Sequence, residues 1–138
     1  KMNNPTYFTE NQTTSVNPHN DLPPEESAKI IINHVLQGIE IAKKNGLPDR
    51  VIDFIRTHHG TSFVYYFYKM QEDLTPGEVD VKKFTYPGPI PFSKETAILM
   101  MCDACEAASK SIKEPSALLI GDLVEKIISG QMSKGQFM

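Results

Sequence analysis

Apolar residues recur at intervals of three and four positions along most of the chain, which is the spacing of an amphipathic helix. No stretch alternates apolar and polar residues convincingly for more than four positions, so the pattern predicts no β-strand. The periodic stretches predict helices over about 23–45, 48–59, 62–73, 94–112 and 115–130. We therefore predict an all-α fold, a bundle of about five helices.

Prolines, glycines and short polar residues mark the ends of these helices. Residues 23–26, Pro-Pro-Glu-Glu, have the composition of a first helical turn, and Gly46 is placed to end the same helix. Ser93 is a typical N-cap for the fourth helix. Residues 1–20 and 74–92 are rich in turn-forming residues, and we predict both as loops. The second is a long loop that contains several prolines and glycines.

Composition and charge limit the class of protein. The chain has 138 residues, 40% hydrophobic and 22% charged, which is typical of one soluble domain over residues 1–138. A net charge of −3 and a pI near 5.8 give no basic surface for DNA or RNA. No uncharged apolar stretch reaches the roughly 18 residues that a membrane span needs. A small phosphorylated ligand stays open, because a bound metal or a lysine cluster can outweigh the overall charge.

The remaining cysteine, histidine and charge features have structural interpretations. Cys102 and Cys105 lie within an apolar run and not at a helix N-terminus, so we predict two buried, reduced thiols, which suits the cytosol. His19 lies in the first loop and is expected to be exposed to solvent. Glu106 and Lys110 are four residues apart and are expected to form a surface ion pair.

Four potential metal ligands lie beside apolar helix faces: His34, the adjacent pair His58 and His59, and Asp103. Each has a structural alternative. His34 fits a hydrogen-bonded core histidine, the pair fits the negative end of a helix dipole, and Asp103 fits an ion pair with Arg56 or a lysine. The run around Asp103 is apolar, so its carboxylate is costly to desolvate without a cation. A divalent metal would favour all four positions, which points to metal-assisted hydrolysis.

These residues stand in strings that resemble a known family. The strings are Lys1–Pro5 with Glu10–Gln12, Ile31–Val35, Ile55–Thr61, Tyr86–Pro89 with Ser93–Glu95, and Asp103–Ser109. In this order they resemble the HD-domain metal-dependent phosphohydrolases. More closely, the chain is similar to the cytosolic HD domain of bacterial seven-transmembrane HD phosphodiesterases, which hydrolyse cyclic di-AMP.

The resemblance implies a helical domain with two metal ions, iron or manganese, that opens cyclic di-AMP to the linear dinucleotide. It implies that His34, His58 and His59 bind one metal and Asp103 the other. Lys1 matches the lysine that follows the family's His-Asp dyad, and we predict it as a catalytic residue for phosphate contact or proton transfer. We predict three substrate contacts from phosphate- or base-compatible chemistry near the motifs: Arg56, Tyr86 and Lys94.

The dyad itself would stand just upstream of Lys1, in a string of His-Asp-x-Gly-Lys type, of which only the lysine is present. We therefore expect an N-terminally truncated HD domain that binds at most one divalent metal ion, weakly, and is inactive alone. The parent is expected to carry a membrane region upstream, with this part a soluble cytoplasmic domain at the inner or plasma membrane. A second copy could complete the core as a homodimer.

Two other functions stay open. One is an HD phosphohydrolase for another nucleotide, such as cyclic di-GMP, although Tyr86–Pro89 differs from the Gly-Tyr-Pro signature of that group. The other is a non-catalytic module for nucleotide binding or dimerisation. A His-Asp dyad upstream of Lys1 would favour the enzyme over the module.

Overall fold

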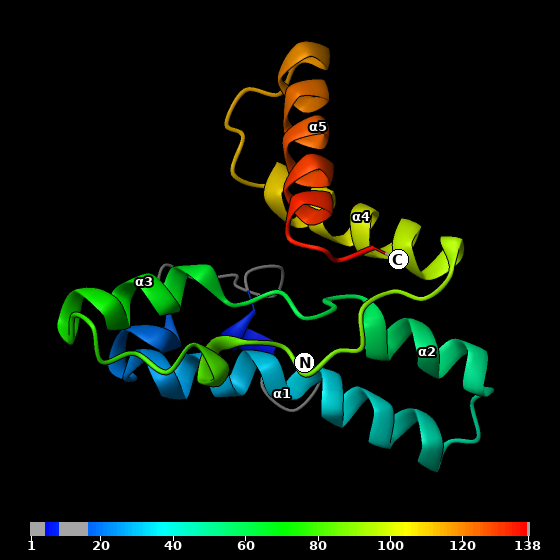
Figure 1. The fold of residues 1–138 in the computed structure, drawn as a ribbon, viewed down its shortest axis with the longest axis horizontal. Helices are drawn as coiled ribbons and strands as arrows, with labels where there is room; N and C mark the ends of the chain where they lie inside the picture. The colour runs from blue at the N-terminus through cyan, green and yellow to red at the C-terminus, as the bar shows by residue number, and fades with distance from the viewer. Residues whose placement is uncertain (1–4, 9–16, 138) are drawn as a thin grey trace. The chain divides into compact units, whose positions relative to one another are not determined.

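The structure, a computed structural model, describes residues 5–8 and 17–137. Within these residues the chain forms five α-helices, which are α1 (Pro24–Lys44), α2 (Asp49–Thr57), α3 (Tyr65–Leu74), α4 (Lys94–Ser109) and α5 (Ala117–Ser133) (Figure 1). The segments predicted as loops contain short 3-10 turns, which are η1 (Pro5–Tyr7), η3 (Pro18–Asp21) and η4 (Val81–Phe84). Extended pairing in the described part is limited to one bridge between Phe63 and Thr85. The all-α prediction is confirmed.

The described residues up to Pro48 pack with Ser62–Pro87 into one compact unit. In this unit α1 lies against α3 and η4 (Figure 1). Its core contains Ala28 from α1, Phe67 from α3 and Phe84 from η4, and both Ala28 and Phe84 are fully buried. The apolar face of α1 therefore packs against segments that follow Ala28 by about 40 and 55 residues, which holds the N-terminal half of α1 in place.

Asp49–Thr61 and the described residues from Gly88 onward form a second compact unit, in which α4 contacts both α2 and α5. A capping box starts α4: the Ser93 hydroxyl accepts from the Thr96 N–H at 3.2 Å, and the Thr96 hydroxyl accepts from the Ser93 N–H at 3.1 Å. Thr96 and Met100, one turn apart, are buried. No residue of α5 is buried, and Leu118 is 74% exposed. None of the helices that the structure describes combines the length and apolarity needed to cross a bilayer.

Two helix boundaries differ from the periodic pattern for identifiable reasons. The third helix begins at Tyr65 because Ser62–Val64 are extended: the Val64 N–H donates to the Phe84 carbonyl at 2.7 Å, and the Tyr86 N–H donates to the Ser62 carbonyl at 2.8 Å. The fifth helix continues past Gly130 to Ser133. It ends before Gly135, which has the left-handed φ of +68° typical of a residue just after a helix.

The prediction of two buried cysteines is wrong. Cys102 is exposed and Cys105 is partly exposed. The buried face of α4 is marked by Thr96 and Met100, and Cys102 lies about 200° around the helix from Met100. The sequence around these cysteines is apolar on every side of the helix, so its pattern did not identify the inner face. Partial burial still raises the pKa of the Cys105 thiol, and the charge of the neighbouring Cys102 raises it further.

The prediction that His19 is exposed is also wrong, because the residue is only 7% exposed. It meets the Tyr7 ring edge-on at a centroid distance of 5.0 Å and the Phe67 ring at 5.1 Å. Its Nε2 donates to the Tyr7 carbonyl at 2.6 Å. The predicted surface pair is confirmed, since Lys110 Nζ lies 3.0 Å from Glu106 Oε1 on α4.

Candidate metal centre

His34 lies in the middle of α1 and is 7% exposed. Its Nδ1–H donates to the carbonyl of Ile31, one turn earlier. A carbonyl oxygen can only accept, so this bond places the proton on Nδ1 and the coordinating lone pair on Nε2. The rings of Phe8 and Tyr86 meet the imidazole edge-on, at centroid distances of 5.3 and 6.1 Å. One hydrogen bond and two aromatic contacts therefore orient the ring.

His58 and His59 follow the last residue of α2, where the chain leaves the helix. The helix ends at Thr57, and Gly60 takes a left-handed φ of +51°, which reverses the chain at low steric cost. The two imidazole centroids are 4.1 Å apart, whereas adjacent side chains within a helix point about 100° apart. His58 Nδ1–H donates to the Ile55 carbonyl at 2.6 Å, so His58 has the same tautomer as His34. The end of the helix thus brings the two imidazoles together.

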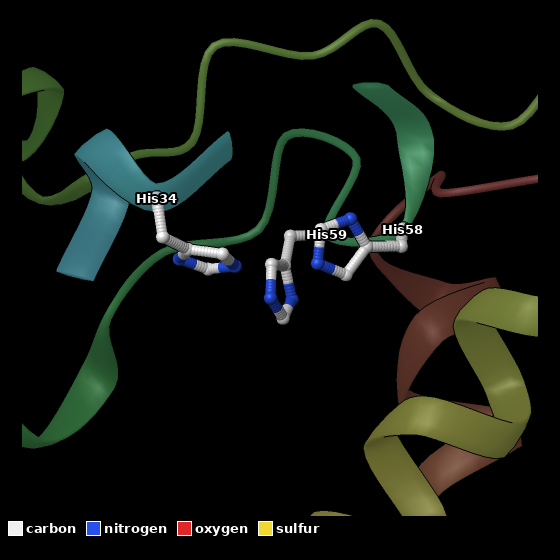
Figure 2. Close-up of side chains that lie close together, drawn as sticks. All are labelled: His34, His58 and His59. Carbon is white, nitrogen blue, oxygen red and sulfur yellow. The ribbon is translucent and has the colours of Figure 1, made fainter. Parts of the chain in front are cut away.

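Figure 2 shows the imidazoles of His34, His58 and His59 close together. One potential ligand atom from each lies within 4.8 Å of the other two. His34 is buried and the pair is partly exposed. Neutral imidazole nitrogens are common ligands of divalent transition metals, and the Nδ1 hydrogen bonds of His34 and His58 hold both rings in the tautomer that binds through Nε2. This histidine cluster can bind a metal ion.

Asp103 lies on α4 next to the histidine pair but outside the three-histidine cluster. Its Oδ2 is 3.9 Å from His59 Nδ1, and the two side chains are 39% and 23% exposed. The Asp103 carboxylate is therefore less buried than its apolar neighbours suggested, so the argument from the cost of desolvation does not support it as a ligand. Its position beside His59 is the observation that supports it. A carboxylate there can orient the imidazole, or bind a second ion, from the same place.

Tyr86 and Arg56 were predicted as substrate contacts from chemistry and proximity alone. Tyr86 is 8% exposed and packs edge-on against His34, so the structure gives it a role in holding that ring. Arg56 lies in the last turn of α2, and its Nε is buried without a hydrogen-bond partner among the described residues. A buried guanidinium N–H of this kind is suited to donate a hydrogen bond to an anionic partner.

Lys94 and Lys1 were the two candidate lysines. Lys94 is the first residue of α4 and is exposed at the edge of a hollow of about 340 Å³, which Phe92 and Phe137 also line. A hollow lined by one cation and two aromatic residues is compatible with a phosphate and a base. Lys1 lies outside the described residues.

Sequence reasoning missed Gln136, which contacts the turn that follows His59. Its side-chain oxygen accepts from the Thr61 N–H at 2.9 Å, across a separation of 75 residues. A glutamine near the end of an exposed helix has no periodic or motif signature, so no pattern in the sequence marks it.

Replacing Gly60 with alanine is expected to destabilise the chain by about 2–5 kcal/mol. A left-handed φ costs a residue with a Cβ about 1–2 kcal/mol, and overpacking adds about 1–3 kcal/mol because the new Cβ would collide with Gln136 Oε1. Gly46→Ala is the matched control, since Gly46 has a φ of +69° but nothing within 4 Å of a built Cβ. Urea denaturation of both variants measures the difference. Equal losses of unfolding free energy in the two variants would mean that Gln136 leaves enough room for a Cβ at position 60.

Comparison with known proteins places this geometry in context. No protein-family model matches the chain. It is 42% identical over 135 residues to the cyclic-di-AMP phosphodiesterase PgpH of Listeria monocytogenes serotype 1/2a (strain 10403S), covering 96% of this chain and 18% of the relative. It is 39% identical over 137 residues to PgpH of Bacillus subtilis (strain 168), covering 99% of this chain and 19% of that relative.

Solved structures agree with these relatives. The crystal structure of the L. monocytogenes phosphodiesterase PgpH HD domain in complex with cyclic-di-AMP superposes with a TM-score of 0.91 at 40% identity, covering 96% of this chain and 61% of that one. The chain spans about a fifth of the length of the two PgpH relatives described above. Over nearly all of its own length, the chain is similar in sequence to the PgpH cyclic-di-AMP phosphodiesterases, and it has the fold of the PgpH HD domain.

Proposed function

We propose that the protein containing this chain is a metal-dependent phosphodiesterase that hydrolyses cyclic di-AMP to the linear dinucleotide. The observation on which the proposal rests is the cluster of His34, His58 and His59, whose ligand atoms lie within 4.8 Å of one another. The names of the relatives supply the substrate, and the solved complex with cyclic-di-AMP supports it.

In this proposal His34, His58 and His59 hold one divalent ion, iron or manganese, and Asp103 contributes to a second. His34 and His58 would bind through Nε2, because their Nδ1 protons are engaged by carbonyl oxygens. When bound, the ions supply Lewis-acid stabilisation of the phosphodiester charge and activation of a water molecule. Asp103, whose Oδ2 is 3.9 Å from His59 Nδ1, would favour by its charge the orientation of His59 that turns Nδ1 toward it.

The remaining candidates are assigned to the substrate. Arg56 and Lys94 supply positive charge for the phosphates, which a chain with a net charge of −3 must provide locally. Tyr86 contacts the substrate or, through its ring contact, holds His34. Lys1 is assigned to phosphate contact or proton transfer.

We further propose that this chain is a cytoplasmic domain of a membrane protein, with a membrane region upstream. A homodimer is also proposed. The apolar residues Leu118, Leu119 and Ile120 at the start of α5 are 74%, 48% and 43% exposed, which leaves apolar surface for a second copy to cover.

The test measures metal binding and hydrolysis separately. The chain is titrated with Mn²⁺ and Fe²⁺ and its metal content determined by elemental analysis, and we expect one weak site per chain. The full-length protein is then incubated with Mn²⁺ and cyclic di-AMP, and we expect the linear dinucleotide as product. Cyclic di-GMP serves as the matched substrate, and faster hydrolysis of it would favour the alternative nucleotide. Binding of cyclic di-AMP with no product would favour a non-catalytic module.

A further inference from the structure

Gln136 is a buried polar residue at the C-terminal end of the second unit, 4% exposed, and both ends of its amide are used. Its Oε1 accepts from the Thr61 N–H at 2.9 Å and lies 3.4 Å from the Thr61 hydroxyl. Its Nε2 donates to the Thr61 hydroxyl and to the Lys134 carbonyl, each at 3.2 Å. Because oxygen and nitrogen have different partners, the amide has one favoured orientation, with the oxygen toward the Thr61 N–H.

The turn that follows the histidine pair is shaped around this amide. Gly60 is buried, and a Cβ at its position would collide with Gln136 Oε1 and lie 3.4 Å from Met100 Cε. On another side, a Cβ at Gly88 would lie 2.9 Å from Thr61 Cγ2. Two close approaches therefore depend on glycine: Gln136 Oε1, which bonds the Thr61 N–H, lies against Gly60, and Thr61 Cγ2 lies against Gly88.

We propose that Gln136 is a positioning residue for the His58–His59 pair: by bonding the Thr61 backbone, it fixes the turn that directs both imidazoles. The proposal rests on the proposed metal-binding function. His59 is two residues from the bonded N–H, and His58 has its ring oriented by Ile55 from the helical side. Helix α2 therefore anchors the pair from the N-terminal side, and Gln136 anchors it from the C-terminal side. Partners of this kind, one step removed from the metal, affect affinity because they set ligand direction.

The test replaces Gln136 with methionine, which keeps the length of the side chain and removes its hydrogen bonds. In the metal-free chain, hydrogen exchange of the Thr61 amide is expected to accelerate about tenfold, since its N–H loses its partner and turns to water. The Ile120 amide, bonded to Ser116 in the first turn of α5, is the internal reference and should not change. Affinity for Co²⁺, read from its visible spectrum, is expected to fall about 10–100-fold.

Two further variants separate positioning from general loss of structure. Gln131→Met makes the same replacement on α5, where Gln131 Oε1 has no hydrogen-bond partner within the described part of the chain, and should leave the Co²⁺ affinity unchanged. Thr61→Val removes the hydroxyl bonds but keeps the backbone N–H on Gln136 Oε1, so its Co²⁺ affinity should stay within about threefold of the original.

The outcomes distinguish this proposal from the proposed function. Faster Thr61 exchange with weakened Co²⁺ binding supports positioning by Gln136. Faster exchange with unchanged affinity overturns it, and so does unchanged exchange. If the unaltered chain shows no Co²⁺ spectrum, the proposed metal function fails. Positioning by Gln136 is then tested by the nitrogen chemical shifts of the His58 and His59 rings in the metal-free chain. Shifts that change in Gln136→Met but not in Gln131→Met support positioning, and shifts that change in neither contradict it.

Discussion

Replacing His58 with alanine is expected to lower the affinity of the chain for Mn²⁺ or Co²⁺ by more than about a hundredfold. Loss of a residue that only orients a ligand costs about 10–100-fold in affinity, and loss of a coordinating nitrogen should cost more. The remaining residues of the cluster, His34 and His59, would leave only two imidazoles for the ion. Isothermal titration calorimetry measures the change, with the folded state of each variant checked by circular dichroism.

His19→Ala is the control for this experiment, because His19 is the one histidine of the four that is not in the cluster. It is buried between Tyr7 and Phe67, so its removal should lower stability while metal affinity stays within about twofold. If His19→Ala weakened binding as much as His58→Ala does, the ligand assignment would be wrong. Equal affinity of His58→Ala and the unaltered chain would have the same meaning.

Replacing Phe84 with alanine is expected to cost about 3–5 kcal/mol of unfolding free energy, the usual range for a large aromatic residue in a core. Phe84 is fully buried, and its loss would leave a cavity beside Ala28 and Phe67. The Tyr68 ring, edge-on at a centroid distance of 6.0 Å, would lose its partner as well. Because Phe84 belongs to the unit that contains α1, the change should also loosen the helix that presents His34.

Phe92→Ala is the matched control, since Phe92 is 46% exposed and its removal should cost about 1 kcal/mol or less. Urea denaturation followed by tyrosine fluorescence measures both variants. A loss at Phe84 no larger than that at Phe92 would contradict the core described for the first unit.

The helices, and the positions of the candidate ligand histidines on them, could be predicted from the sequence because both depend on local information. His34 lies beside an apolar helical stripe, and His58 and His59 stand where a glycine ends a helix. The bonds that set the tautomers of His34 and His58 run to carbonyls three residues earlier, so they too are local. Asp103 was predicted as a ligand because a carboxylate in an apolar run is unusual. In the structure, the observation that supports this prediction is its distance from His59.

The features that were missed depend on contacts between distant residues. Gln136 acts on a turn 75 residues away, and nothing in its neighbourhood distinguishes it from other polar residues near a helix end. His19 was assigned to solvent because its segment is polar, yet Tyr7 and Phe67 cover it. Cys102 was assigned to the core because α4 is apolar all round, and only packing partners decide which side of such a helix is buried.

The order in which the chain visits its two units restricts how the molecule can be divided. The chain passes from one unit to the other at Pro48, returns after Thr61 and leaves again after Pro87, so each unit is assembled from separate stretches. No single cut releases either unit intact. The 13-residue stretch Asp49–Thr61, which bears the histidine pair, is an excursion out of the first unit. A protease nick after Thr61 would split both units at once, whereas a nick after Pro48 would split only the first unit and leave both stretches of the second in one fragment. Domain dissection by terminal truncation is therefore unsuited to this protein.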